Sequence, residues 1–254
     1  MIYDVQKASF IKRLSAFLLD FILLCVLTSG FAFLLAWITN IDSYTDALQG
    51  YYEQCEQEFG VDVRDITQEE YNELPKEEQA VYDAAFDWLN KNADAVKAYN
   101  MSVALPMLIT TFSILLSYVV FEFVVPLCLK NGQTVGKKVF GIGVVFNNSV
   151  RLSTFALFVR AIFGKYTIGT MFPVALIMLV LYGQMGLLAI ILVAALFILQ
   201  LVLVIATKNN CFVHDILANT VVVDLSSQMI FDSTQELISY KEEVSKQQAE
   251  KKEY

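Results

Sequence analysis

The stretch Lys12–Asp20, KRLSAFLLD, opens an apolar run that continues to Trp37 and decides the class of this protein. The run exceeds the roughly 18 apolar residues that mark a membrane span. Arg13 lies at its start and Asp20 lies about two helical turns further in. Side chains seven positions apart lie on nearly the same face of a helix, about 10 Å apart along its axis. An ionised side chain at that depth is costly unless it is paired or hydrated, so these two residues are the first candidates for a functional site.

The composition of the whole chain predicts an integral membrane protein. Its 254 residues are 56% hydrophobic, which is more than a soluble domain of this size needs. The first apolar run is too long for a signal peptide and contains an aspartate, so we interpret it as a permanent span. We predict an all-α fold, a four-helix transmembrane bundle with an extracytoplasmic helical insert and a small cytoplasmic β-hairpin or sheet. The predicted spans are 14–39, 101–129, 167–182 and 187–207, the last two joined by a short turn at Gly183–Gly186.

Charge is distributed unevenly along the chain. Residues 40–100 hold fifteen of the 26 acidic residues and four of the 18 basic residues. Basic residues elsewhere flank the apolar runs, at Lys12 and Arg13, between 130 and 165, and at Lys208. By the positive-inside rule these short basic segments face the cytoplasm. We therefore expect both termini in the cytoplasm and the acidic segment outside.

The acidic segment is predicted to be a small helical insert. A helix is expected from Ser43 to Phe59, with Gly60 as its stop. Thr67 followed by Glu70 is a capping-box signature at the start of another helix. Apolar residues then recur at spacings of three and four, which predicts a stripe that faces a partner helix. The last helix of the insert is expected to continue into the second span.

The segment after the second span is predicted to contain a β-hairpin. Residues 139–146 are expected to form a strand, Asn147 and Asn148 a turn, and residues 150–153 a return strand. Residues 152–166 are amphipathic and are predicted to form a helix along the inner membrane interface.

The C-terminal part is predicted to add a third strand and a charged helix. A short interfacial helix at 211–219 and a strand at 220–223 are expected to pair with the hairpin. The tail has the composition of a mobile or partner-bound helix. The predicted divisions are 1–39 for the cytoplasmic N-terminus and first span, 40–100 for the insert, 101–129 for the second span, 130–166 for the hairpin and interfacial helix, 167–207 for the third and fourth spans, 208–225 for the last interfacial helix and strand, and 226–254 for the tail.

Several separated groups of residues resemble the RDD family of bacterial membrane proteins. They are Arg13, Ala16 and Asp20 in the first span, Gly132, Thr134, Gly136, Lys137 and Gly141 after the second, Arg160, and His214, Asp215, Ala218 and Thr220 near the end. That family is named for one arginine and two aspartates, which correspond here to Arg13, Asp20 and Asp215. The resemblance covers residues 8–39 and 101–225 and implies a multi-pass protein of the bacterial cytoplasmic membrane. The insert is longer than the family's usual outer loop.

The resemblance leaves two interpretations of the charged residues inside the spans. Sodium/proton exchange has been proposed for some members of the family, and Asp20 with Glu122 would then alternate between a proton and a cation while Arg13 gates access. In the other interpretation, Arg13, Asp20, Asp215, Arg160 and Glu122 form a buried polar network that fixes helix register. We favour the second, because four spans form a thin bundle with little room for alternating access.

The expected function is therefore that of a non-catalytic membrane scaffold or accessory subunit, and the alternative is a sodium/proton-type exchanger based on Asp20. A membrane-embedded enzyme is a weaker third hypothesis, because the sequence has no evident nucleophile and base, metal set or phosphate cradle. One histidine and four scattered cysteines predict no metal site, and no cofactor is expected. Expected partners are the lipid bilayer, a second copy or a complex partner bound through 40–100 or 226–254, and a small cation or proton. No nucleic-acid partner is expected.

Overall fold

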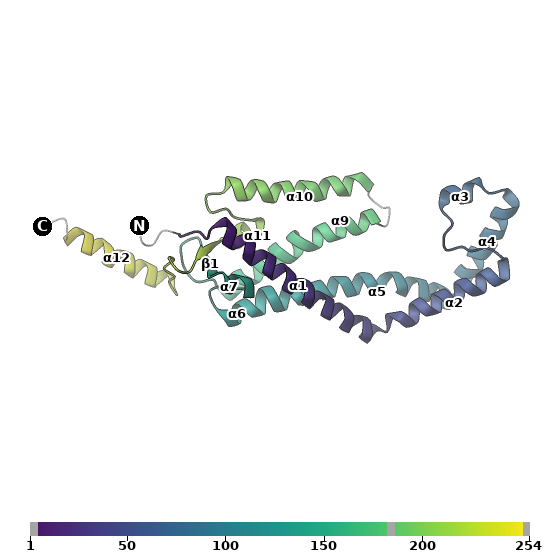
Figure 1. Cartoon of the computed structure of the whole chain (residues 1–254), viewed down its shortest axis with the longest axis horizontal. Helices are drawn as coiled ribbons and strands as arrows, with labels where there is room; N and C mark the ends of the chain where they lie inside the picture. The colour runs from purple at the N-terminus through teal and green to yellow at the C-terminus, as the bar shows by residue number, and fades with distance from the viewer. Residues whose placement is uncertain (1–4, 182–185, 251–254) are drawn as a thin grey trace. The chain divides into compact units, whose positions relative to one another are not determined.

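The computed structural model describes residues 5–181 and 186–250 (Figure 1). Helices dominate these residues, and the chain is an all-α membrane-type protein with a small antiparallel sheet. The predicted turn at Gly183–Gly186 falls mainly on residues outside the described part. The elements are α1 (Phe10–Thr39), α2 (Ile41–Phe59), α3 (Gln68–Glu73), α4 (Lys76–Lys91), α5 (Ala93–Tyr118), the π-helix η1 (Val119–Val124), α6 (Val125–Leu129), α7 (Val135–Val139), β1 (Ile142–Phe146), α8 (Thr154–Phe158), the π-helix η2 (Val159–Met171), α9 (Phe172–Leu181), α10 (Gly186–Ala206), α11 (Val213–Leu217), β2 (Thr220–Asp224) and α12 (Thr234–Glu250).

Four helical stretches in the described residues are long and apolar enough to cross a membrane. Large apolar side chains remain exposed on them, such as Phe33 at 78% and Ile205 at 82%, because lipid rather than protein would cover these faces. The stretches are Phe10–Thr39, Ala93–Leu129, Thr154–Val180 and Gly186–Ala206. The number of spans is as predicted, and the largest difference in their bounds is at the start of the third.

The residues predicted as a separate helix, 152–166, instead form the first part of one continuous helical stretch from Thr154 to Leu181. Helices α8, η2 and α9 follow one another without a break. The charged residues that suggested an interfacial helix, Arg160 and Lys165, are each paired with a carboxylate of another helix. The polar stripe therefore faces protein, and the segment does not need to lie along the membrane surface.

The small sheet pairs β1 with β2, as predicted for the strand at 220–223, whereas the return strand predicted at 150–153 is reduced to a single bridge. The two strands are antiparallel, with Val144 opposite Val222. The expected return strand makes only an isolated bridge at Arg151. Two local features account for this. Ser149 has a positive φ of 64°, and the Ser153 hydroxyl accepts a hydrogen bond from the Ala156 amide, which starts α8 where the return strand was expected.

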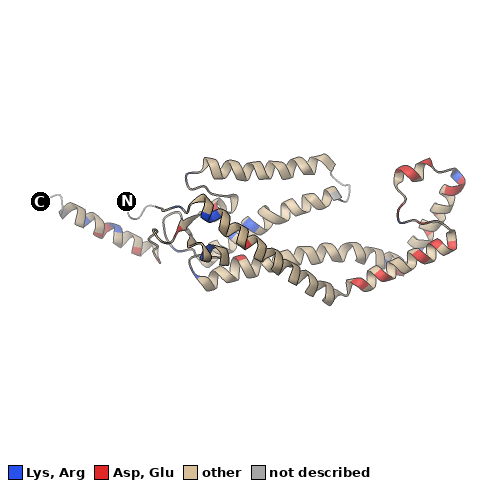
Figure 2. Cartoon of the chain, in the orientation of Figure 1, with Lys and Arg blue, Asp and Glu red and all other residues tan. Residues whose placement is uncertain are grey.

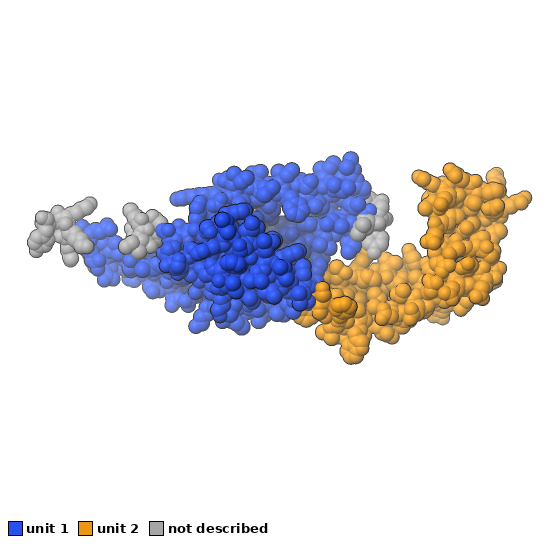
Figure 3. Space-filling model, in the orientation of Figure 1, with its two compact units in different colours: residues 1–28, 114–254 blue, residues 29–113 orange. Residues whose placement is uncertain are grey.

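The chain divides into two compact units, residues 1–28 with 114–254, and residues 29–113 (Figure 3). The second unit contains the acidic insert, and Figure 2 shows its acidic residues distributed over α2, α3 and α4. Helices α2 and α4 enclose a small core of Cys55, Val63 and Ala85, so the predicted stripe does face a partner helix. The capping box of Thr67 and Glu70 is confirmed.

Helix α5 continues from the insert into the second span, as expected, but it is separate from α4. The backbone leaves the helical conformation at Asn92, where α4 ends. The Asn92 side-chain oxygen then accepts hydrogen bonds from the amides of Asp94 and Ala95 at 3.0 and 3.2 Å. These are the bonds that an N-cap residue makes, so Asn92 ends one helix and starts the next.

The tail is anchored to the first unit where it begins. Phe231 and Leu237 are buried against Val150. The backbone amide of Arg151 also donates a hydrogen bond to the Phe231 carbonyl at 2.9 Å. Helix α12 therefore begins from a fixed point beside the sheet, and most of its remaining length is exposed.

Candidate functional site

Asp20 is buried against the segment that follows the second span. It is 6% exposed, and its carboxylate accepts hydrogen bonds from the Thr134 hydroxyl and from the Gly136 amide, the latter at 2.7 Å. Thr134 is the N-cap of α7, so the residue that starts this short helix also binds Asp20. The described residues show no contact between Asp20 and Arg13, which corrects the expectation that these two side chains interact.

The close approach at Gly136 explains why a residue without a side chain occupies this position. A Cβ atom there would overlap the Ala16 carbonyl oxygen and would lie 2.7 Å from Asp20 Oδ1. Ala16 is itself buried at the crossing of α1 and α7. Small side chains at both positions let the α7 backbone reach the carboxylate, as close approach between backbones requires.

Lys137 is buried beside the Asp20 contact. It is 7% exposed, and its ammonium group donates to the Thr134 hydroxyl at 3.2 Å. Burial lowers the pKa of Lys137 to about 7, and the positive charges of Lys165 and Arg160 act in the same direction. The carboxylates of Glu122 and Asp20 oppose the shift. A lysine in this position can change its charge near neutral pH.

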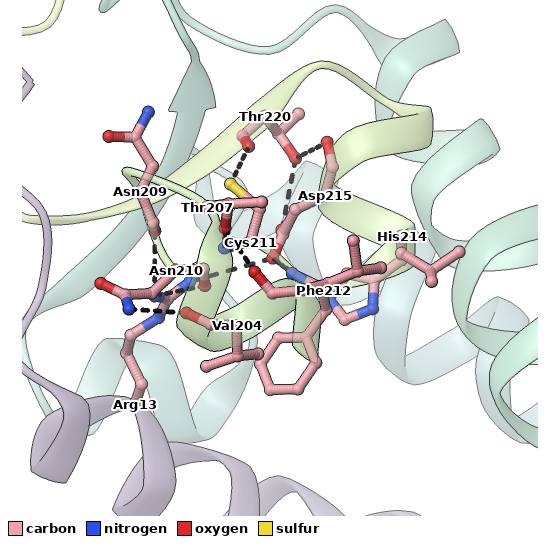
Figure 4. Close-up of polar contacts among 12 residues, drawn as sticks. Arg13, Val204, Thr207, Asn209, Asn210, Cys211, Phe212, His214, Asp215 and Thr220 are labelled. Carbon is pink, nitrogen blue, oxygen red and sulfur yellow. Dashed lines mark hydrogen bonds and ion pairs between the residues drawn. The ribbon is translucent and has the colours of Figure 1, made fainter. Parts of the chain in front are cut away.

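Asp215 is fully buried and pairs with two arginines, Arg13 and Arg160. Figure 4 shows Asp215 with Arg13 and the neighbouring residues of this cluster. Arg160 donates to the Oδ1 atom of Asp215 from Nη2 at 2.6 Å and from Nε at 3.1 Å. Arg13 Nη2 lies 3.8 Å from Oδ2, and Arg13 Nη1 donates to the carbonyls of Asn209 and Asn210 at 3.3 and 2.9 Å. Burial alone would raise the pKa of Asp215, but Arg160 and the other donors outweigh it and hold the pKa below its usual range.

His214 is a packing residue in this cluster. Its ring stacks on Phe212 with the centroids 5.5 Å apart. Its backbone lies against Gly164 of η2, where an added Cβ would come within 2.7 Å of the His214 Cα. Burial lowers the pKa of His214 to about 3, so the imidazole is neutral at physiological pH. It therefore adds no positive charge beside Asp215.

Glu122 is buried and pairs with Lys165, whose ammonium group lies 2.5 Å from its carboxylate. Both residues lie in π-helical segments, η1 and η2. Lys165 follows Arg160 by five residues, the hydrogen-bond spacing of a π-helix, which brings these two positions closer in rotation than an α-helix would. Lys165 is not among the predicted site residues, because five residues from Arg160 is a different face of an α-helix and only the structure shows that this segment is π-helical.

The predicted network is therefore three contacts rather than one chain of ion pairs. Asp20 binds Thr134 and Gly136, Asp215 binds two arginines, and Glu122 binds Lys165. The remaining family-motif residues shape the same region: Thr220 donates to the Asp215 carboxylate and carbonyl at 3.4 Å, Ala218 is buried and ends α11, and Gly132 and Gly141 have positive φ angles of 59° and 65° on either side of α7. Among the described residues, no group of three or more His, Cys, Asp or Glu side chains is arranged to hold a metal ion.

Comparison with known protein families matches residues 7–219 to the RDD family. Searches of curated proteins and of solved structures found no match to this chain. The matched range includes all three carboxylate contacts. With its four apolar helices and this family match over most of its length, the chain belongs to the RDD family of membrane proteins.

Proposed function

We propose that this protein is a non-catalytic membrane scaffold or accessory subunit of the bacterial cytoplasmic membrane, with both termini in the cytoplasm. The observation that carries the proposal is that each carboxylate buried in or beside the spans has its own partner within the first unit. Asp20, Glu122 and Asp215 are all held at hydrogen-bond distance by side chains or backbone of other helices. Contacts of this kind fix how helices pack and need no exchange with solvent.

The surfaces proposed for partners are the acidic insert and the tail. The insert is a folded helical unit that holds most of the chain's acidic residues, which are coloured red in Figure 2. Helix α12 projects charged side chains from an anchored start. Crosslinking in native membranes should lose one set of adducts when residues 43–98 are deleted and another when residues 234–254 are deleted, while the bundle remains folded.

Exchange of a cation for a proton is the second candidate function, and one feature of the Asp20 contact favours it. The two groups that bind Asp20 directly are neutral, and Lys137 beside them has a pKa lowered to about 7. A carboxylate held by neutral donors keeps its charge uncompensated, which is a condition for binding a cation.

Ion flux in proteoliposomes distinguishes the two functions. Wild-type protein and the Asp20→Asn variant would be reconstituted with a pH-sensitive dye inside, and sodium gradients would be imposed. The scaffold proposal predicts no flux above empty liposomes from protein shown to be folded. Sodium-dependent alkalinisation that is lost in the variant would overturn it and establish exchange.

A further inference from the structure

A cavity of about 120 Å³ lies where the second span ends and the third begins. It is lined by Pro126 and Leu127 from α6, by the turn Lys130–Gly132, and by residues 151–154 with Leu157. The second span ends at Leu129 and the third starts at Thr154. The end of an apolar span marks the interface between the hydrocarbon core and the polar headgroups, so we place the cavity at this interface.

The polar lining of this cavity suits an anion. Its two charged side chains, Lys130 and Arg151, are both basic, and Ser153 and Thr154 add hydroxyl groups. Arg151 also pairs with Asp232, at 2.7 Å. Asp232 does not line the cavity, so the lining itself carries positive charge without a carboxylate. Basic pockets at the ends of membrane helices are the usual sites for anionic lipid headgroups.

The backbone of the turn is held in an uncommon conformation at the basic residue. Lys130 has φ 63° and ψ 175°, a region that is nearly restricted to glycine. Asn131 and Gly132 also have positive φ, of 49° and 59°. Hydrogen bonds from the Gln133 amide to Lys130 and from the Val144 amide to Asn131 hold the turn in place. Such strain persists where surrounding structure imposes it, and it is frequent at ligand clamps.

Asn131 contributes a polar atom that requires a donor. Its side-chain oxygen is buried and has no hydrogen-bond partner in the described part of the chain. A buried acceptor without a donor is unfavourable, and native proteins rarely leave one unsatisfied. The phosphodiester of a phospholipid has no proton to donate to it, whereas a headgroup hydroxyl does.

We propose that this cavity binds the phosphate of an anionic phospholipid whose headgroup carries hydroxyl groups. Lys130 and Arg151 bind the phosphate, and a headgroup hydroxyl donates to Asn131. The exposed apolar side chains of Leu127 and Phe155 provide a surface for the acyl chains. This inference is independent of the scaffold function, because it concerns a surface that none of the three carboxylate contacts shares.

Native mass spectrometry of the full chain would test the proposal. Purified protein in detergent would be titrated with phosphatidylglycerol, with phosphatidylcholine of the same acyl chains, and with inorganic phosphate. Phosphatidylglycerol should bind at least tenfold more tightly than phosphatidylcholine. Lys130→Gln and Arg151→Gln should each weaken phosphatidylglycerol binding about fivefold, as expected for one basic residue near an anionic lipid.

Two further variants sharpen the test. Asp232→Asn removes the carboxylate that competes for Arg151 and should tighten binding, by up to about fivefold. Lys138→Gln removes the same charge from an exposed position of α7 outside the cavity and should leave binding unchanged. Circular dichroism and Tm would verify that each variant is folded.

Three results would overturn the proposal. One is equal affinity for the two lipids, and another is a loss of binding in Lys138→Gln as large as that in Lys130→Gln. The third is displacement of the lipid by low-millimolar inorganic phosphate that itself remains bound, which would make the cavity a site for free phosphate.

Discussion

Asp20 and Asp215 are buried carboxylates in the same unit, but they are stabilised in different ways. Asp215 lies beside the guanidinium groups of Arg160 and Arg13, which compensate its charge. Asp20 is bound by a hydroxyl and a backbone amide, which solvate a charge without compensating it. Removing the charge of Asp215 leaves two buried arginines without a carboxylate between them. Removing the charge of Asp20 leaves two neutral donors, to which an asparagine amide can still bind. Replacing each aspartate by asparagine should therefore lower the stability of the protein by different amounts.

The largest expected effect is that of Asp215→Asn. Breaking a buried ion pair by neutralising one partner costs about 3–5 kcal/mol, because the remaining charge stays buried. Thermal unfolding in lipid nanodiscs should show a large fall in Tm. The matched control is Asp224→Asn, which removes a carboxylate paired with the more exposed Lys12 and should cost about 1 kcal/mol or less. Equal losses in the two variants would contradict this account of the arginine cluster.

An intermediate effect is expected for Gly136→Ala. The added methyl group would overlap the Ala16 carbonyl and displace the amide that binds Asp20, at a cost of about 1–3 kcal/mol. The matched control is Gly30→Ala, since a Cβ at that helical glycine meets nothing within 4 Å. That control should be neutral or slightly stabilising. A Tm that falls by the same amount in both would show that the Asp20 contact does not depend on close backbone approach.

A smaller effect is expected for Asp20→Asn. The amide oxygen still accepts from the Gly136 amide, and only the difference between a charged and a neutral hydrogen bond is lost, about 1 kcal/mol. The fall in Tm should therefore be clearly smaller than for Asp215→Asn under the same conditions. A loss as large as that of Asp215→Asn would mean that the Asp20 charge is compensated by a cation, with Lys137 as the nearest candidate.

The effect that depends on pH concerns Lys137, which lies beside Asp20 and not beside Asp215. Burial lowers its pKa to about 7 from an ordinary value of 10.5, so between these values the unfolded chain binds more protons than the folded chain. Stability contributed by this group should therefore rise with pH across that window. Lys137→Met should flatten the rise in Tm between pH 7 and 10, and Lys138→Met should not. An identical pH profile in wild type and Lys137→Met would contradict the inferred burial of this charge.

The local part of the fold could be predicted from the sequence alone. Apolar run length predicted four spans, because a helix must cover the hydrocarbon thickness with its own residues. The capping box at Thr67 and the stop at Gly60 were correct, since both depend on side chains within a few residues. The candidate residues were also found in the sequence, because ionisable side chains inside apolar runs are conspicuous.

Only the tertiary structure decided which of these residues meet. Spacing along one helix suggested that Arg13 faces Asp20, but Arg13 binds beside Asp215 and Asp20 binds α7. The strand β1 pairs with β2, as predicted, whereas the segment that follows β1 contributes only an isolated bridge at Arg151. Long-range pairings of this kind depend on how whole helices pack, and packing is set by close approaches such as that at Gly136. Periodicity reports which face of a helix is polar, whereas the partner of that face is chosen by the rest of the fold.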